Sequence, residues 1–231
     1  MSCSLVGSEM CIRDRDSFPQ IAGQASSMFP QLVCTIMSGF SSSDVHALLA
    51  TSAEVKLQTA ADCSEAVMKA AEMIVASLGD GGKLMFCGNG GSAGDSQHLA
   101  AEFVATLDHR RPRHGLAALA LTTDTSFLTA YANDFGFGGV FARQVETLGR
   151  PGDVLVAIST SGNSGNVVAA CKAARDNGIR ICAMTGEGGG QLAEHADVLL
   201  AVPSKVTMHI QESHIALGHV MTLAVERLMD L

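Results

Sequence analysis

Aromatic residues are scarce in this chain. It has no Trp and one Tyr, and aromatic side chains make up 4% of the residues, whereas 47% are hydrophobic. Small and aliphatic side chains must therefore fill the interior, which suits helices packed closely on a parallel sheet. No apolar run approaches the roughly 18 residues that a membrane-spanning helix needs, and the N-terminus lacks the basic-then-apolar layout of a secretory signal. We therefore expect a cytoplasmic protein without a membrane span.

Basic residues are also few. Lys and Arg number 15 against 23 Asp and Glu, which gives a formal charge of −8, and the longest basic cluster is the short one at Arg110, Arg111 and Arg113. Nucleic-acid binding normally needs a basic face, so the composition argues against a nucleic-acid partner. An anionic ligand would have to be held by local donors, because the overall field of the protein repels it.

The cysteines show no CxxC spacing and are odd in number, which indicates neither a disulfide framework nor a thiolate zinc site. Several lie in apolar runs, where a free Cys behaves as a small hydrophobic residue. We expect reduced, buried thiols in a reducing compartment. The seven cysteines are Cys3, Cys11, Cys34, Cys63, Cys87, Cys171 and Cys182.

The patterning of the chain changes near residue 41. Residues 1–15 have no clear periodicity and look like a leader or a gene-model artefact, and residues 16–40 are weakly patterned. We therefore expect residues 1–40 to be a poorly ordered extension and residues 41–231 to form one domain. Ser41–Asp44 offers N-cap chemistry for a helix over about 44–58, and a second helix is predicted over about 62–78.

From there, short apolar runs alternate with helical stretches. The apolar runs are Lys83–Cys87, Leu116–Leu121, Asp153–Ile158, Arg180–Thr185 and Val198–Val202; the helical stretches lie near 92–106, 124–132, 138–148, 164–177, 190–195 and 207–229. Such alternation is typical of βαβ units. The sequence therefore predicts an α/β three-layer sandwich with a five-stranded parallel sheet and N-terminal helices. Ligands of such sheets bind outside the carboxyl ends of the strands.

Two of these carboxyl ends carry loops suited to a phosphate. The first predicted strand leads into Gly88–Ser92, where glycines allow close approach to a ligand and the next helix offers its N-terminus to an anion. The third leads into Ser159–Ser164, which has four hydroxyls in six residues. Each loop alone is also compatible with an ordinary turn or cap, and neither matches a nucleotide fingerprint. Together they favour a phosphate on a small polar molecule.

Four motifs, in order and with compatible spacing, resemble the phosphoheptose isomerase family of the sugar-isomerase (SIS) domain group. The motifs are C-G-N-G-G-S-x-x-D-x-x-H-x-x-x-E (Cys87–Glu102), N-D-F-G-F (Asn133–Phe137), S-T-S-G-N-S (Ser159–Ser164) and Q-E-x-H-x-x-x-x-H (Gln211–His219). The hydroxyl-rich run is shared by many SIS proteins, whereas Glu102 with Gln211 and His219 is more specific.

The resemblance implies a flavodoxin-like homotetramer that converts sedoheptulose 7-phosphate to D-glycero-D-manno-heptose 7-phosphate, a step toward the heptose of bacterial lipopolysaccharide. It also implies one zinc ion per subunit, held by His98, Glu102, Gln211 and His219. The substrate contacts that it implies are Asn89, Gly90, Gly91, Ser92, Glu102, Thr123, Asp124, Ser159, Thr160, Ser161, Ser164 and Gln211. The chain departs from the family at Thr106, where Arg is frequent, and at Met208, where Asp is common, so rate or substrate preference can differ.

Ketose–aldose isomerisation needs a base that moves a proton between adjacent carbons and a second group that handles the oxygens. We predict that Glu102, with His98 one turn earlier on the same side of the helix, is the carbon acid/base. His219 would move protons at the sugar oxygens. Without the motifs, a solvated Glu102 and a core His219 are the simpler interpretations. Gln211 and His219 are eight residues apart, about 12 Å along a helix, so they meet one ion only if both reach inward or neighbouring subunits contribute.

Two other functions compete with the isomerase. One is a non-catalytic SIS tetramer that binds a protein such as a replication initiator; those relatives tend to lose the Glu and the terminal His, and this chain has both. The other is the sugar-phosphate sensor of a regulator, which we do not favour because the sequence has no helix-turn-helix segment. The sequence therefore favours the enzyme.

Overall fold

The computed structural model describes residues 39–231, so nearly all of the extension predicted over 1–40 lies outside the described residues. The chain divides into two compact units, Met1–Leu48 and Leu49–Leu231. In the described part of the first unit, the backbone N–H of Ser41 donates to Asp44 Oδ2 at 2.7 Å. This contact closes the first turn of the helix that begins there, as the N-cap chemistry predicts.

Helix α2 spans Ser42–Gly79 without a break. The prediction of two helices over 44–58 and 62–78 is therefore wrong. The three residues between those segments are Thr59, Ala60 and Ala61, and none of them interrupts a helix as Gly or Pro would. The helix ends where the glycines begin, and Gly81 takes a positive φ of 79°.

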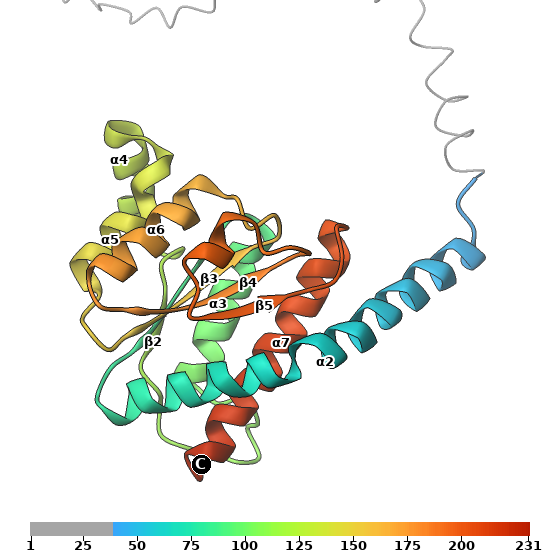
Figure 1. Cartoon of the computed structure of the whole chain (residues 1–231), viewed down its shortest axis with the longest axis horizontal. Coiled ribbons are helices and arrows are strands. Elements are labelled where there is room, and N and C mark those ends of the chain that lie inside the picture. The colour runs from blue at the N-terminus through green and yellow to red at the C-terminus, as the bar shows by residue number, and fades with distance from the viewer. Residues whose placement is uncertain (1–38) are drawn as a thin grey trace, which may run out of the picture. The chain divides into compact units, whose positions relative to one another are not determined.

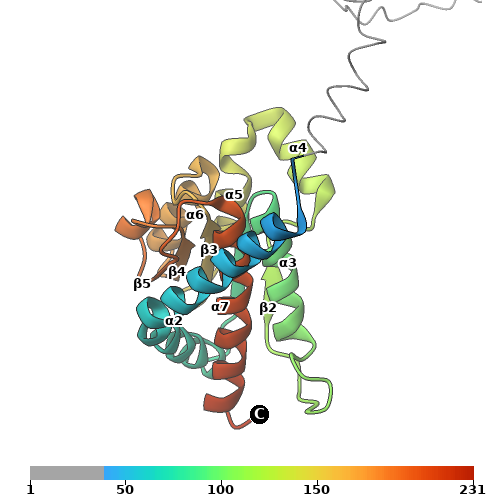
Figure 2. The same cartoon turned by 90° about the vertical axis from the view of Figure 1, so that its right-hand side faces the viewer.

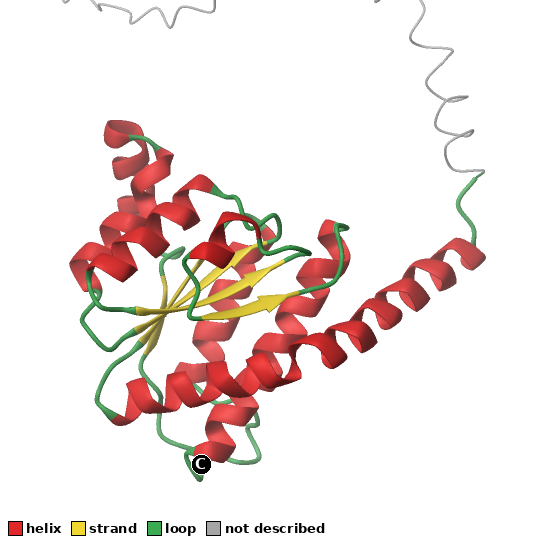
Figure 3. Cartoon of the chain, in the orientation of Figure 1, coloured by secondary structure: helices red, strands yellow, loops and turns green. Residues whose placement is uncertain are grey.

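Five parallel strands form one sheet in the order β2-β1-β3-β4-β5 (Figures 1 and 3). The strands are β1 (Leu84–Gly88), β2 (Ala118–Ala120), β3 (Val154–Ser159), β4 (Arg180–Thr185) and β5 (Val198–Ala201). Every residue of β1 and β3 is buried, as expected for strands covered on both faces. The predicted α/β sandwich with a five-stranded parallel sheet is confirmed.

Helices cover both faces of this sheet. After α2 they are α3 (Gly91–Val104), α4 (Thr125–Phe135), α5 (Val140–Leu148), α6 (Gly165–Asp176) and α7 (Thr207–Leu228), with 3-10 turns η1 (Phe137–Gly139) and η2 (Gly190–Glu194). Side chains of α2, α3 and α7 pack with Phe86 and Val156, whereas those of α5 and α6 pack with Met85 and Leu155 on the opposite face. None of the helices in the described part of the chain has an apolar stretch long enough to span a bilayer.

Helices α3 and α7 run side by side on one face of the sheet (Figures 1 and 2). Their contact is unusually close at Gly218, because a Cβ atom there would lie 2.4 Å from Leu99 Cδ2. Phe103 of α3 and Met221 of α7 are fully buried in the same core. The two helices that carry the first and the last of the four predicted motifs are thus held against one another.

Candidate active site

The strand order reverses between β1 and β3, which is where open α/β sheets bind their ligands. The loop after β1 is joined to the first turn of α6, which follows the loop after β3, by a reciprocal amide pair. Asn89 Nδ2 donates to Asn166 Oδ1 at 2.8 Å, and Asn166 Nδ2 donates to Asn89 Oδ1 at 2.9 Å. The two loops predicted to bind phosphate therefore lie together. The sequence analysis did not single out Asn166, because its partner Asn89 lies 77 residues earlier in the chain.

The loop after β1 is shaped by glycines. Gly90 is the N-cap residue of α3 and has φ 55° and ψ −119°, a conformation that side chains disfavour. A Cβ atom on Gly91 would lie 2.4 Å from Gln211 Nε2, so this glycine makes room for the start of α7. Ser92, one of the predicted substrate contacts, lies buried in the first turn of α3. The helix N-terminus still presents its positive end to an anion.

The loop after β3 gathers hydroxyl groups. Ser159 Oγ lies 2.9 Å from Ser164 Oγ and 3.5 Å from Ser161 Oγ. The backbone N–H of Asn163 donates to Ser161 Oγ at 3.1 Å, which fixes that hydroxyl. Three of the four predicted hydroxyls therefore converge where α6 begins, and they offer neutral donors to an anion.

A polar cavity of about 240 Å³ borders this hydroxyl loop. Thr160 and Ser161 line one side of it, and Ser204, Lys205 and Thr207, which precede or begin α7, line another. The predicted phosphate loop and the start of α7, the helix that carries Gln211, therefore line the same cavity.

Two further predicted contacts lie after β2, next to β1 in the sheet. Asp124 is the N-cap of α4, and its Oδ1 accepts the backbone N–H of Phe127 at 2.9 Å. The Thr123 hydroxyl donates to the carbonyl of Ala120 at 3.1 Å. Both side chains therefore already have backbone partners at the carboxyl edge of the sheet.

His98, Glu102 and His219 form the centre of the site. His98 Nε2 lies 2.8 Å from His219 Nε2 and 3.4 Å from Glu102 Oε1. The side chain of His98 is 48% exposed and that of Glu102 is 21% exposed, so a ligand can reach the group. Gln211 lies two turns before His219 on α7, with its amide against Gly91. Three of the four predicted metal ligands are thus neighbours within one subunit.

This trio has the geometry of a cation site. One nitrogen or oxygen atom from each residue lies within 4.8 Å of the other two. Two ring nitrogens at 2.8 Å repel one another unless a proton or a cation lies between their lone pairs. Two imidazoles and one carboxylate are also a ligand set typical of zinc sites that keep an open position. The residues present can therefore hold a metal ion.

Two titratable groups on the same helices have shifted pKa values: Asp95 on α3 is half-buried, and His214 on α7 is fully buried. Burial raises the pKa of Asp95 to about 6, against the opposing effect of His98, and Asp95 Oδ2 has no hydrogen-bond partner within residues 39–231. Burial lowers the pKa of His214 to about 4, and its Nε2 lies 3.0 Å from the carbonyl oxygen of Thr185 at the end of β4. His214 is therefore neutral near pH 7, and it contacts the end of β4.

Comparison with known proteins agrees with this geometry. A family model described as the SIS domain matches residues 49–186. The chain is 53% identical over 176 residues to the phosphoheptose isomerase of a Roseiflexus species, covering 76% of this chain and 88% of that protein. It is 55% identical over 166 residues to the phosphoheptose isomerase of Rhodospirillum rubrum, covering 71% and 87% respectively.

A solved structure of a phosphoheptose isomerase is also similar to this chain. The phosphoheptose isomerase of Neisseria gonorrhoeae superposes with a TM-score of 0.75 at 47% sequence identity, covering 80% of this chain and 98% of that one. Similarity of this extent covers the sheet and the helices that carry the site.

Proposed function

The chain belongs to the phosphoheptose isomerase family, and we propose that it converts sedoheptulose 7-phosphate to D-glycero-D-manno-heptose 7-phosphate for heptose biosynthesis. The observation that carries this proposal is the approach of His98, Glu102 and His219 from two helices beside a pair of anion-binding loops. Isomerisation of a ketose phosphate requires both a binding site for its phosphate and an acid/base pair at its carbonyl end.

The phosphate end would be held by neutral donors. Ser159, Ser161 and Ser164 supply hydroxyls, and the N-termini of α3 and α6 supply backbone N–H groups and positive dipole ends. Such local donors suit a protein with a charge of −8, because its overall field does not attract an anion. Thr160, Asn89 and the glycines of the first loop complete this part of the proposed site, and Thr123 and Asp124 border it.

Glu102 would act on the carbons. Its carboxylate takes the proton from C1 of the open-chain ketose, and the electrons of the C–H bond form an enediol. The same carboxylate then returns the proton to C2. Because Oε1 faces His98, Oε2 is the oxygen free to face the substrate.

His219 would act on the oxygens. As the enediol forms and collapses, a proton must leave the oxygen of C1 and another must reach the oxygen of C2, and one imidazole can accept and donate these in turn. Its short contact with His98 fixes the ring at the site. Gln211 would bind the substrate from the start of the same helix.

A zinc ion fits the same residues. His98, Glu102 and His219 would hold it, with Gln211 as the fourth ligand implied by the family resemblance. When bound, zinc polarises the oxygens on C1 and C2 and so stabilises the negative charge of the enediol. The donor set and its spacing within 4.8 Å support this assignment.

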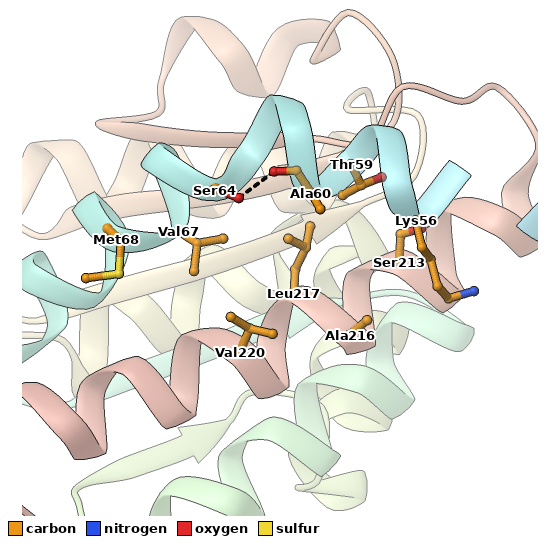
Figure 4. A pocket seen from close by; sticks show the side chains of 10 residues that line it. All are labelled: Lys56, Thr59, Ala60, Ser64, Val67, Met68, Ser213, Ala216, Leu217 and Val220. Carbon is orange, nitrogen blue, oxygen red and sulfur yellow. Dashed lines mark hydrogen bonds between the residues drawn. The ribbon is translucent and has the colours of Figure 1, made fainter. Parts of the chain in front are cut away.

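A homotetramer is supported by an apolar surface between α2 and α7. A cavity of about 410 Å³ opens there, and Figure 4 shows Val67 and Met68 of α2 facing Leu217 and Val220 of α7. Val220 is 55% exposed and Met68 is 44% exposed. An apolar patch of this kind is typical of a subunit interface, and we propose that other copies of the chain cover it.

The competing protein-binding function has less support. The chain keeps both Glu102 and His219, with one ligand atom of each within 4.8 Å of the other. A protein that only binds a partner has no need for that arrangement. The buried free thiols of Cys63, Cys87, Cys171 and Cys182 suit the cytoplasm, where we place the reaction.

An assay of several ketose phosphates tests the proposed function. Purified protein incubated with sedoheptulose 7-phosphate should give an aldose phosphate that is followed by NMR, with slower conversion of shorter ketose phosphates. Conversion of none of them by protein loaded with zinc would contradict the proposal.

A further inference from the structure

A buried ion pair joins the ends of the two helices that carry the proposed active site. Arg113, in the loop between α3 and β2, places its Nε 2.7 Å from Oε1 of Glu226 on α7. The side chain of Arg113 is 2% exposed and that of Glu226 is 9% exposed. A pair this well buried costs desolvation, and it persists only where further hydrogen bonds satisfy the charges.

Arg113 also donates to the carbonyl of His114 in its own loop and, at 3.4 Å, to that of Ala105 just after α3, but two of its hydrogen bonds reach the C-terminal end of α3 itself. Its Nη2 donates to the carbonyl oxygen of Glu102 at 2.8 Å, and its Nη1 donates to that of Phe103 at 2.9 Å. The last carbonyls of a helix have no partner within the helix, so a guanidinium here caps α3. One of the two carbonyls belongs to Glu102, the proposed carbon acid/base.

Glu226, the partner of Arg113, lies on α7. It lies seven residues after His219, which is two turns, so both side chains point from the same face of α7. Its Oε1 also accepts the backbone N–H of Leu107, just after α3, at 3.4 Å. Three contacts therefore line the interface between α3 and α7: His98 with His219, Leu99 with Gly218, and the Arg113–Glu226 pair.

We propose that Arg113 and Glu226 are positioning residues that fix how α3 and α7 lie along one another, and thereby the spacing of His98, Glu102 and His219. The inference rests on the proposed function for its kinetic consequences, but its consequence for metal binding does not depend on turnover. Residues that orient metal ligands typically change metal affinity by about ten- to a hundredfold when they are replaced.

Two variants separate positioning from folding. Arg113→Lys keeps a charge beside Glu226, but a single ammonium cannot span Glu226 and both carbonyls. The double variant Arg113→Met/Glu226→Leu removes both charges, so no uncompensated charge is left in the interior. Arg110→Met is the matched control, because Arg110 lies in the same loop, is 78% exposed and pairs with Asp108 of that loop.

Three kinds of measurement are made on the full chain. Zinc affinity is measured by competition with a chromophoric chelator, Tm by thermal unfolding, and kcat and KM with sedoheptulose 7-phosphate as substrate. We expect both Arg113 variants to bind zinc about ten- to a hundredfold more weakly, with kcat reduced similarly. KM should change far less, because the phosphate is held mainly by loops that the pair does not contact. The single variant Arg113→Met, which leaves Glu226 buried and unpaired, is made as a reference for Tm. The double variant should have a higher Tm than this reference while its zinc affinity stays low, and Arg110→Met should match the wild type.

Wild-type zinc affinity in either folded Arg113 variant would overturn the inference. So would a double variant whose zinc affinity and kcat return together with its Tm, since the pair would then contribute only stability. Wild-type protein that binds zinc but does not turn over would instead refute the proposed function, and the zinc titration would still test the pair.

Discussion

The Nε2 atoms of His98 and His219 lie 2.8 Å apart although 121 residues separate them in the chain. The contact exists because α3 and α7 cover the same face of the sheet, and because Gly218 lets the two helices approach at Leu99. Glu102 joins the pair one turn along α3. A single subunit is therefore enough to bring these three side chains together.

Removal of metal should abolish the activity. Treatment with a strong chelator is expected to remove zinc, lower turnover to background and lower Tm, because a ligand present at a hundred times its Kd stabilises the folded state by about 2.7 kcal/mol. Added zinc should restore both. His98→Ala should bind no zinc, whereas His109→Ala, at an exposed position, should bind it normally. Full activity in protein shown by mass spectrometry to be metal-free would contradict the zinc assignment.

Substitution of Gly162 should damage phosphate binding. A Cβ atom there would lie 2.1 Å from the carbonyl oxygen of Gly189, and Gly162 has a φ of +65°, a conformation that costs other residues of order 1–3 kcal/mol. Gly162→Ala is therefore expected to displace the hydroxyl loop and raise KM for the sugar phosphate by at least about tenfold. Gly165→Ala, three residues along in open space, should leave KM unchanged. Equal KM values in the two variants would contradict this account of the loop.

The buried His214 should make stability depend on pH. Its pKa is lowered by burial from 6.5 to about 4, so between these values the unfolded chain binds a proton that the folded chain does not. Stability therefore falls as pH falls through this window, and His214 alone accounts for a loss of about 2 kcal/mol between pH 7 and pH 5.

Urea unfolding of His214→Gln at the two pH values tests this prediction. The variant should be less stable at pH 7 but should lose about 2 kcal/mol less than the wild type on acidification. An identical loss in both proteins would show that His214 does not titrate in this range.

The sequence predicted much of this architecture because its signals are local. Alternating apolar runs and glycine-bounded turns placed all five strands, and the cluster of hydroxyls at Ser159–Ser164 marked a loop that does lie at the carboxyl edge of the sheet. The division of α2 into two helices was wrong, since it depended on a stop signal that Thr59 and its neighbours do not provide.

Contacts between residues that lie far apart in the chain could not be predicted from the sequence. Nothing near Arg113 indicates that its partner Glu226 lies 113 residues further on, and nothing near Asn89 indicates Asn166. The spacing of Gln211 and His219 along one helix left open whether one subunit could assemble the metal ligands. The packing of α3 on α7 brings three of the predicted ligands, His98, Glu102 and His219, together within one subunit.

A charge in the apolar cavity should disrupt assembly. Val220 lines the cavity between α2 and α7 and is 55% exposed. In the proposed tetramer, Val220→Asp would bury an unpaired carboxylate, so a smaller mass is expected by light scattering. Leu148→Asp, on the opposite face of the sheet at 43% exposure, is the matched control and should keep the wild-type mass. A wild-type protein that is monomeric at micromolar concentration would refute the proposed tetramer.

The central claim is that Glu102 moves the proton between the carbons of the substrate, and Glu102→Gln tests it most directly. Single-turnover conversion of sedoheptulose 7-phosphate should fall by at least about a hundredfold, while calorimetry shows the sugar phosphate still bound. Glu72→Gln, which replaces an exposed carboxylate on α2, should convert the substrate at the wild-type rate. Wild-type turnover by Glu102→Gln would contradict the account.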